Sequence, residues 1–568
     1  MVPGTQLNWL PNFVNPPILS QIDVDYSFAR VRKAEQGFTP VPASPCRKEV
    51  EDLLAIADTL MTANPKLGGE LDEWRRQLDN VLEGPIADDL ATEARLEALS
   101  MDLRYQWITL ARSIVSGDMK APPMNHLPIL PVSRSTPFMY ERVLGSSPIQ
   151  EKLKGALPTI PGWQTEVTLF SSGMAAIGAA ITVLRHLRGR YGCAGGGMLQ
   201  LDMLGGYFET LVLLDLLDSS DLRCRSFRDA ETLLERFHGG TTDILFLEVI
   251  AYDWKQSVID PAKLLQALKS RPADRPWILM LDTTMLGPYF DAAPLLAGCQ
   301  DNKPLLVLEV RSGLKLDQVG LEFSNVGIIK SLTPYDLDSS RYPDAKELHE
   351  ILSWSRKVLG TALSLSEIAV LDAPWIFHSH WMEAHTRAVL DNNRRLALAL
   401  DGIRGLFRRV NHPGLGEQKN LSWAESPIVV MEFHAPEDSD DNHQFLLAVI
   451  AHEVRRRQLV VQLGCSFGFR HHRCEVVIPG QGHCHPDGKP RGYFKVAMGS
   501  RCGPSLQGTI ELMRELAAFP DFRSLRLAFP QVKPKRELAR FPSLRSLRKV
   551  KPAEGLTEAC RLSTLQAG

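Results

Sequence analysis

The chain has 568 residues and a formal net charge of -2, with 44% hydrophobic and 23% charged residues. This balance is typical of a soluble globular protein with two to four domains, and it gives no overall attraction for nucleic acid or an anionic membrane. No run approaches the roughly 18 unbroken apolar residues of a membrane helix, and the N-terminus lacks a secretory signal pattern. Nine scattered cysteines indicate reduced thiols, so we expect a cytoplasmic protein.

The first 120 residues predict an N-terminal arm followed by a helical region. Residues 1–45 are rich in proline and lack sustained periodicity, which is typical of an extended arm. Ser44 is placed to cap a helix, and further helical patterns follow around 71–82 and 87–115. A proline-rich stretch over 120–131 then predicts an extended linker.

Residues 133–340 carry the pattern of a large α/β domain. Short apolar runs bounded by Gly, Asp or Pro alternate with helical stretches, which predicts parallel βαβ units in a sheet covered on both faces. The expected strands are Val167–Phe170, Gly197–Leu201, Ile244–Val249, Trp277–Leu281, Leu305–Val310 and Gly327–Ile329.

Residues 341–520 predict a linking helix and a smaller α+β domain. The helical stretch runs over roughly 345–405, and strands are expected at Ile428–Phe433, Leu459–Leu463 and Tyr493–Met498. Residues 521–568 form a basic tail, for which we expect a solvated, mobile segment; binding of a polyanion is the alternative.

Lys315 follows the apolar run 304–310 and a short polar turn. In α/β proteins the carboxyl edge of the sheet carries the chemistry, and a lysine there forms a Schiff base with a carbonyl cofactor if its pKa is lowered. The alternative is an ordinary surface lysine after a strand.

Two more strand ends carry candidate groups. Ser172, Gly173 and Met174 follow a strand and open a helix, where free backbone N–H groups and the helix dipole attract a phosphate; an ordinary helix start is the alternative. Asp282 ends another strand before Thr284. Its carboxylate either caps the next helix or keeps a proton on a pyridine nitrogen.

The order of these motifs resembles the Cys/Met-metabolism family of pyridoxal-phosphate (PLP) enzymes of fold type I, which includes cystathionine γ-synthase, cystathionine lyases and methionine γ-lyase. The resemblance covers about residues 133–517. The similar segments are Tyr140–Arg142 with Pro148, Phe170–Ile177, Leu281–Pro288, Arg311–Lys315, Gln462–Gly464 and Phe494–Gly499. The fold implied is a large mostly parallel-sheet domain with a smaller C-terminal α+β domain, here with an extra N-terminal helical region.

The resemblance also implies roles for single residues. Lys315 is the Schiff-base lysine and Asp282 the partner of the pyridinium, while Ser172, Gly173, Met174 and Ser312 cradle the phosphate. Tyr140 and Arg142 reach the phosphate of a neighbouring subunit, which implies a homodimer or dimer of dimers with shared active sites. Further implied cofactor or substrate contacts are Tyr207, Glu248, Tyr252, Thr284, Gln462 and Lys495.

Several positions depart from the family pattern. Leu314 replaces the threonine before the lysine, and Leu204 stands where the stacking tyrosine is expected, so Tyr207 takes the stacking and catalytic role in our interpretation. Either Tyr252 or Asp253 is placed to contact the phenolic oxygen of the cofactor. Lys495 replaces the arginine that binds the substrate α-carboxylate, and lysine lacks the two-pronged geometry of arginine. Three nearby arginines are alternative anchors: Arg470, Arg491 and Arg501.

A histidine- and cysteine-rich stretch over 471–485 matches no common zinc spacing, so we expect no metal. Cys465 is expected as a loop residue near the substrate rather than as a nucleophile.

The resemblance implies a PLP-dependent lyase or transferase that acts on an amino acid by γ-elimination or γ-replacement, through a β,γ-unsaturated intermediate. The departures favour capture by a second small-molecule substrate, with C–C or C–S bond formation in specialised metabolism. As a hypothesis, the donor carries a sulfonium or an acylated γ-oxygen, as S-adenosylmethionine carries a sulfonium. An aminotransferase, a C–S β/γ-lyase and a non-catalytic binding relative remain alternatives.

Overall fold

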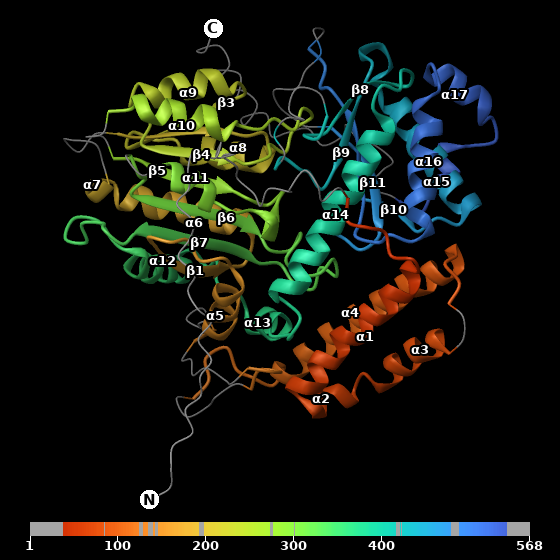
Figure 1. The fold of residues 1–568 in the computed structure, drawn as a ribbon, viewed down its shortest axis with the longest axis horizontal. Coiled ribbons are helices and arrows are strands. Elements are labelled where there is room, and N and C mark those ends of the chain that lie inside the picture. Colours follow the sequence, from red (N-terminus) through yellow and green to blue (C-terminus); the bar gives the residue numbers. More distant parts are fainter. Residues whose placement is uncertain are drawn as a thin grey trace, which may run out of the picture.

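The computed structural model describes residues 38–83, 86–123, 129–133, 140–141, 146–191, 198–272, 276–299, 302–415, 421, 423–478, 485 and 488–541. They form a helical N-terminal region, a large domain around a seven-stranded sheet and a smaller domain around a five-stranded sheet (Figure 1). This is the architecture that the sequence predicts. Within the described residues, no helix is long and apolar enough to cross a membrane.

The N-terminal region consists of four helices among the described residues. They are α1 Pro45–Ala63, α2 Pro65–Gly69, α3 Asp72–Leu82 and α4 Leu90–Val115. Three of them, α1, α3 and α4, lie where the periodicity predicts them. Ser44 occupies the N-cap position of α1 but makes no capping hydrogen bond with its side chain. Asp89 caps α4 by accepting from the Thr92 amide at 2.7 Å. The expected arm over 1–45 lies largely outside the described residues.

The large domain alternates strands and helices, as predicted. Its strands are β1 Trp163–Phe170, β2 Leu199–Leu204, β3 Leu222–Phe227, β4 Ile244–Glu248, β5 Ile278–Asp282, β6 Leu306–Ser312 and β7 Gly327–Pro334. Its helices are α5 Ser147–Ala156, α6 Gly173–His186, α7 Arg188–Tyr191, α8 Phe208–Leu217, α9 Ala230–His238, α10 Pro261–Ser270 and α11 Ala293–Gly298, with a 3-10 turn, η3, at Gly287–Tyr289.

The strand order in the large sheet is β1-β7-β6-β5-β4-β2-β3. Strands β3, β2, β4, β5 and β6 pair in parallel, whereas β7 runs antiparallel to both of its neighbours. The carboxyl ends of β4, β5 and β6 therefore meet at one edge of the sheet. The sequence missed β3, because an edge strand with the pattern Leu-Arg-Cys-Arg-Ser-Phe lacks the continuous apolar run of the central strands.

Three helices replace the long helical stretch expected over 345–405. They are α12 Ala345–Leu359, α13 Leu365–Leu371 and α14 Ser379–Leu400. Gly360 ends α12 with a φ of 68°, a left-handed conformation that glycine adopts without steric cost. Pro374 follows α13 before α14 begins.

The small domain carries a sheet in the order β10-β11-β12-β9-β8. Its strands are β8 Phe407–Asn411, β9 Val429–Phe433, β10 Val461–Leu463, β11 His472–Val477 and β12 Tyr493–Ala497. Its helices are α15 Asp440–Arg457, α16 Pro504–Ala517, α17 Phe522–Ala528 and α18 Pro534–Glu537, with a 3-10 turn, η5, at Ala435–Glu437. The sequence missed β8 and β11. The prediction of a mobile tail from residue 521 was wrong for its first part, because Phe522, Leu525, Val532 and Leu538 of the segment that carries α17 and α18 pack into the core of the small domain. Residues 542–568 of the basic tail lie outside the described residues.

The helical region shares a hydrophobic core with the large domain. Trp107 of α4 contacts the ring of Trp375 with 5.1 Å between the centroids, and its indole N–H donates to the Val370 carbonyl at 2.8 Å. Both tryptophans are fully buried. The same core contains residues of α1, α3, α13, β1 and β7, so the N-terminal helices are packed into the body of the protein (Figure 1).

Candidate functional site

A cavity of about 560 Å³ lies at the carboxyl ends of β4, β5 and β6, where the loop after β10 also reaches it. It gathers groups that are more than 140 residues apart in the chain. The predicted site residues that line it are Ser172, Gly173, Met174, Tyr207, Glu248, Tyr252, Asp282, Thr284, Ser312 and Lys315.

Lys315 follows β6, and its ammonium group donates to the hydroxyl of Ser466 at 2.5 Å. The ring centroid of Phe467 lies 6.0 Å from the same nitrogen. Burial lowers the pKa of Lys315, because the cavity solvates its charged form less well than water does. A larger fraction of this amine is therefore neutral, and so nucleophilic or basic, than of an exposed lysine.

Asp282 ends β5 and accepts from the Thr284 amide at 2.9 Å. Burial raises the pKa of Asp282 above its ordinary value, against the hydrogen bonds from Thr284. Within the described residues, no cationic side chain stabilises this carboxylate. A cationic group held in the cavity would supply that stabilisation.

The turn between β1 and α6 has the form expected of an anion site. Ser172 is the N-cap of α6 and accepts from the Ala175 amide at 3.1 Å. A Cβ atom on Gly173 would lie 3.1 Å from the Cβ of Ser312, and one on Gly327 would lie 1.9 Å from the Ser172 carbonyl oxygen. These close approaches hold the first turn of α6 against β6 and β7, and Gly173 and Met174 of that turn line the cavity.

Glu248 ends β4 and organises the wall beside Asp282. Its carboxylate accepts from the amides of Gly206 and Tyr207 at 2.9 Å each and from the Tyr252 amide at 2.8 Å. Burial first, and the nearby charge of Asp282 second, raise the pKa of Glu248 to about 8. Glu248 therefore fixes the two loops that carry the tyrosines, while its oxygen atoms are used by backbone groups.

Tyr207 and Tyr252 form an aromatic wall of the cavity. Their ring centroids lie 5.5 Å apart with an interplanar angle of 89°, and Tyr252 stacks on Phe467 at 6.3 Å. Burial raises the phenol pKa of both tyrosines. Both phenols are therefore neutral near pH 7 and able to donate a hydrogen bond.

Lys495 does not line the cavity as its predicted substrate role requires. Its ammonium group donates to the Tyr252 hydroxyl at 2.8 Å and forms an ion pair with Glu475. Lys495 is 1% exposed, and the two groups that it contacts stand between it and the cavity.

Gln462 and Tyr140 also lie away from the cavity. The amide of Gln462 donates to Glu97 of α4 at 3.3 Å, and its side chain is exposed. Tyr140 is 41% exposed, and Arg142 lies outside the described residues. The role of the last two at a neighbouring subunit's phosphate stays a prediction.

The alternative carboxylate anchors are occupied by other partners. Arg470 and Arg501 pair with Glu49 of α1. Arg491 lies 3.6 Å from Glu432 and 4.7 Å above the Trp254 ring. These three arginines are absent from the cavity lining that the structure describes.

The sequence missed several residues that line the cavity, above all Ser466, Phe467 and Glu475. Ser466 and Phe467 lie on a loop between short elements, and Glu475 lies on β11, a strand that the sequence does not predict. Cys465 lines the cavity and is exposed; its place beside a substrate stays a prediction. Among the described residues, no group of histidines, cysteines and carboxylates has the geometry of a metal site.

Comparison with known proteins gives matches in structure only. No family model matches the sequence, and no curated protein matches it. The methionine gamma lyase CalE6 from Micromonospora echinospora matches with 17% identity, 73% coverage of this chain, 98% of that chain and a TM-score of 0.48. Yeast cystathionine gamma-lyase matches with 18% identity, 72% coverage of this chain, 98% of that chain and a TM-score of 0.48. Cystathionine gamma synthase from Xanthomonas oryzae pv. oryzae, in complex with cystathionine, matches with 17% identity, 73% coverage of this chain, 99% of that chain and a TM-score of 0.47.

Proposed function

We propose that this protein is a PLP-dependent enzyme that acts on an amino acid by γ-elimination or γ-replacement. The observation that carries the proposal is the convergence of Lys315, Asp282 and the first turn of α6 in one cavity. These three features match the aldehyde, the pyridine nitrogen and the phosphate of one cofactor.

The residues present fit this cofactor on chemical grounds. Asp282 is a buried carboxylate with a raised pKa and no cationic side chain beside it among the described residues, as expected where a pyridinium would lie. The close packing of Gly173 and Gly327 leaves the α6 amides open to a phosphate, and Ser312 lies beside them. The cofactor supplies an electron sink for charge that develops on the substrate carbons.

The chain's own residues would then bind, orient and move protons. Asp282 holds a proton on the ring nitrogen, and Tyr207 packs its aromatic ring beside the site. Lys315, whose pKa is lowered, takes a proton from the substrate α-carbon and transfers a proton at the β-carbon. The hydroxyl of Ser466 orients the lysine nitrogen between these positions.

The aromatic wall of the cavity favours a cationic leaving group. Tyr207, Tyr252 and Phe467 line the cavity, and a sulfonium is attracted to the faces of aromatic rings. The carboxyl groups of the lining add less to this attraction, because burial raises the pKa of Glu248 and Asp282 and because Glu475 pairs with Lys495. In γ-replacement, the bond from the γ-carbon to sulfur breaks with its electron pair on sulfur, and a nucleophile of the second substrate bonds to the γ-carbon.

A spectral titration tests the cofactor assignment. Purified protein is mixed with PLP, and its visible absorbance is compared with that of Lys315→Ala and of Lys346→Ala, a control on the exposed face of α12. We expect the visible band of a Schiff base between PLP and a lysine in the native protein and in the control. We expect this band to be lost in Lys315→Ala. Absence of the band in the native protein, or its persistence without Lys315, refutes the proposal.

Product analysis separates the reaction outcomes. The loaded enzyme is offered amino acids with sulfonium, acylated-oxygen or thioether groups at the γ-carbon, with and without nucleophiles. Release of a keto acid with ammonia indicates elimination, and a coupled adduct indicates replacement. Transfer of the amino group to the cofactor without loss of the γ-substituent indicates an aminotransferase.

We also propose that the active protein is a dimer with shared sites, based on the resemblance of Tyr140–Arg142 to a segment that reaches a neighbouring subunit. Subunit complementation tests it. Mixing inactive Lys315→Ala with inactive Arg142→Ala restores about a quarter of native activity if each site uses both subunits. No recovery after verified subunit exchange shows that each site is complete within one chain.

A further inference from the structure

We propose that Glu97, on α4 of the N-terminal helical region, is a positioning residue of the cavity. It fixes residues 464–469, called here the cavity loop, and so holds Ser466 against Lys315. The inference rests on the proposed function only in taking Lys315 as the cofactor lysine. The loop itself joins β10 to β11 and closes one side of the cavity.

The connection begins at a buried histidine. The Glu97 carboxylate lies 2.9 Å from Nδ1 of His471, and the Arg473 Nε donates to Nε2 of the same ring at 2.8 Å. Because Nε2 accepts, the ring proton lies on Nδ1, the ring nitrogen that lies 2.9 Å from the Glu97 carboxylate. Burial lowers the pKa of His471, which keeps the ring neutral and able to accept from Arg473.

Arg473 carries the connection into the cavity loop. Its Nη1 donates to the carbonyl of Cys465 at 3.0 Å. Its guanidinium also lies 3.4 Å from the ring centroid of Phe469, which stacks on His471. One planar side chain therefore ties both ends of the loop to the histidine that Glu97 orients.

The loop needs such support because its backbone is strained. Ser466 has a φ of 79°, in the left-handed region that a serine adopts only at a cost in free energy. Its hydroxyl accepts from Lys315, so this conformation places the oxygen atom on the lysine nitrogen. Gly468 has a φ of 83°, and a Cβ atom there would lie 2.0 Å from the Lys315 carbonyl oxygen. The loop thus contacts Lys315 at two points, the side chain at Ser466 and the backbone at Gly468.

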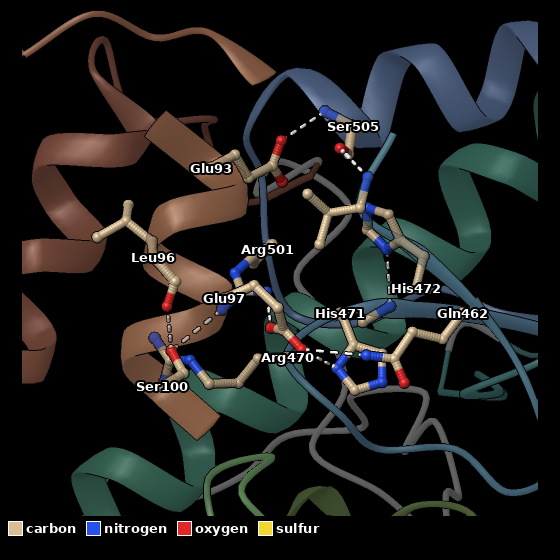
Figure 2. Close-up of polar contacts among 12 residues, drawn as sticks. Glu93, Leu96, Glu97, Ser100, Gln462, Arg470, His471, His472, Arg501 and Ser505 are labelled. Atoms are coloured by element: carbon tan, nitrogen blue, oxygen red, sulfur yellow. Dashed lines mark hydrogen bonds and ion pairs between the residues drawn. The ribbon is translucent and has the colours of Figure 1, made fainter. Parts of the chain in front are cut away.

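A second carboxylate holds the base of the loop. Glu49 of α1 accepts from Arg501 at 2.9 Å and from Arg470 at 3.4 Å. Arg501 also pairs with Glu97 and donates to Ser100 at 3.1 Å (Figure 2). Figure 2 shows Glu97, Arg470 and Arg501 where α4 meets the small domain. The N-terminal helices therefore contact the segment that forms the cavity wall, at Arg470 and His471.

Two roles for Glu97 give different results. If it only joins α4 to the small domain, its loss lowers stability and leaves the loop unchanged. If it positions the loop, its loss loosens residues 464–473 and changes the environment of Lys315 in the folded protein. The first test variant is Glu97→Gln, which keeps the shape of the side chain. The second is Arg473→Lys, which keeps the charge, but its single nitrogen cannot replace both Nε and Nη1 of the arginine. Glu51→Gln, exposed on α1, is the matched control.

The first measurement uses the cofactor-free protein. Limited digestion with trypsin reports cleavage after Arg470 and residue 473, with peptides identified by mass spectrometry. We expect roughly tenfold faster cleavage in Glu97→Gln and Arg473→Lys, from loss of hydrogen bonds to charged groups, and the native rate in Glu51→Gln. Native-rate cleavage in a Glu97→Gln protein with a native circular dichroism spectrum overturns the proposal. If Glu97→Gln does not fold, Arg473→Lys decides by the same criterion.

The second measurement uses protein loaded with PLP. The pH dependence of its visible absorbance is recorded for Glu97→Gln, Arg473→Lys and Ser466→Ala. We expect all three to shift the titration in the same direction, because each removes the oriented hydroxyl from the lysine nitrogen. A shift in Ser466→Ala alone overturns the role of Glu97. If native protein shows no absorbance with PLP, the proposed function fails, whereas the tryptic result still decides whether Glu97 positions the loop.

Discussion

Lys315, Asp282 and Glu248 show how burial sets the chemistry of single residues in this protein. Each sits at or just after the end of a central strand, and in each case burial is the first cause of the pKa shift. The shifts favour a neutral amine and protonated carboxyls in the protein without a bound cation. A bound cationic ring would restore the charged form of Asp282.

Asp282→Asn is expected to lower kcat roughly 10- to 100-fold while binding of PLP through the α6 turn is retained. The asparagine cannot stabilise a proton on the ring nitrogen, and hydrogen bonds to charged groups contribute about 1.5–3 kcal/mol. Steady-state kinetics and PLP titration measure the two effects. Asp260→Asn, the same substitution at the N-cap of α10 outside the cavity, where the asparagine oxygen still accepts the capping hydrogen bond, is the control; an equal loss in both variants contradicts the role of Asp282.

Lys495→Met is expected to destabilise the protein by about 3 kcal/mol, because it leaves the Glu475 carboxylate without its partner in a poorly hydrated place. The double variant Glu475→Gln/Lys495→Met should recover part of this loss. Urea denaturation of the two variants provides the measurement. Equal stability of the single and double variants would show that the pair is not coupled.

At the scale of elements, the site depends on the parallel register of β4, β5 and β6. Glu248 and Asp282 are paired neighbours in this register, so their carboxylates share one edge of the sheet. The apolar runs predicted these strands, and their ends predicted the candidate residues. The cavity loop was not predictable in this way, because contacts between α4 and residues of the small domain at the start of β11 hold Ser466 beside Lys315. Periodicity within one segment carries no information on such contacts.

Acid should loosen the contact between α4 and the small domain. Burial opposes ionisation of Glu97, but hydrogen bonding to His471 and the charge of Arg501 outweigh it and lower the pKa of Glu97 to about 2. Because the folded pKa lies below the ordinary value of 4.5, this contribution to stability is present above pH 4.5 and lost as the pH falls towards 2. Urea denaturation between pH 6 and pH 3 should show the loss. Glu97→Gln should show a weaker pH dependence, and an unchanged dependence would contradict the assignment.

At the scale of the whole molecule, the N-terminal helices are part of the folded body. Their core residues pack with those of α13, β1 and β7, and their carboxylates pair with arginines of the small domain. The region therefore contacts both domains that form the cavity. This arrangement links the stability of the helices to the geometry of the site.

Trp107→Ala is expected to lower the free energy of unfolding by about 3–5 kcal/mol, because it opens a large cavity in a fully buried core and removes the contact with Trp375. Urea denaturation of the variant and the native protein, followed by tryptophan fluorescence and by circular dichroism, measures this free energy. We expect the helical region and the large domain to unfold together. Separate transitions in the native protein would show that the helical region folds independently.

The sequence by itself determined the central strands, the order of the phosphate turn, carboxylate and lysine, and the presence of an N-terminal helical region. These features are local, since apolar runs and capping residues act within one segment. Only the tertiary structure decided that Lys495 pairs with Glu475 behind Tyr252, that Gln462 faces Glu97, and that Ser466 bonds Lys315. The physical reason is that a buried charge takes the partner that the packing of distant segments provides, and the spacing of residues along the chain does not specify that partner.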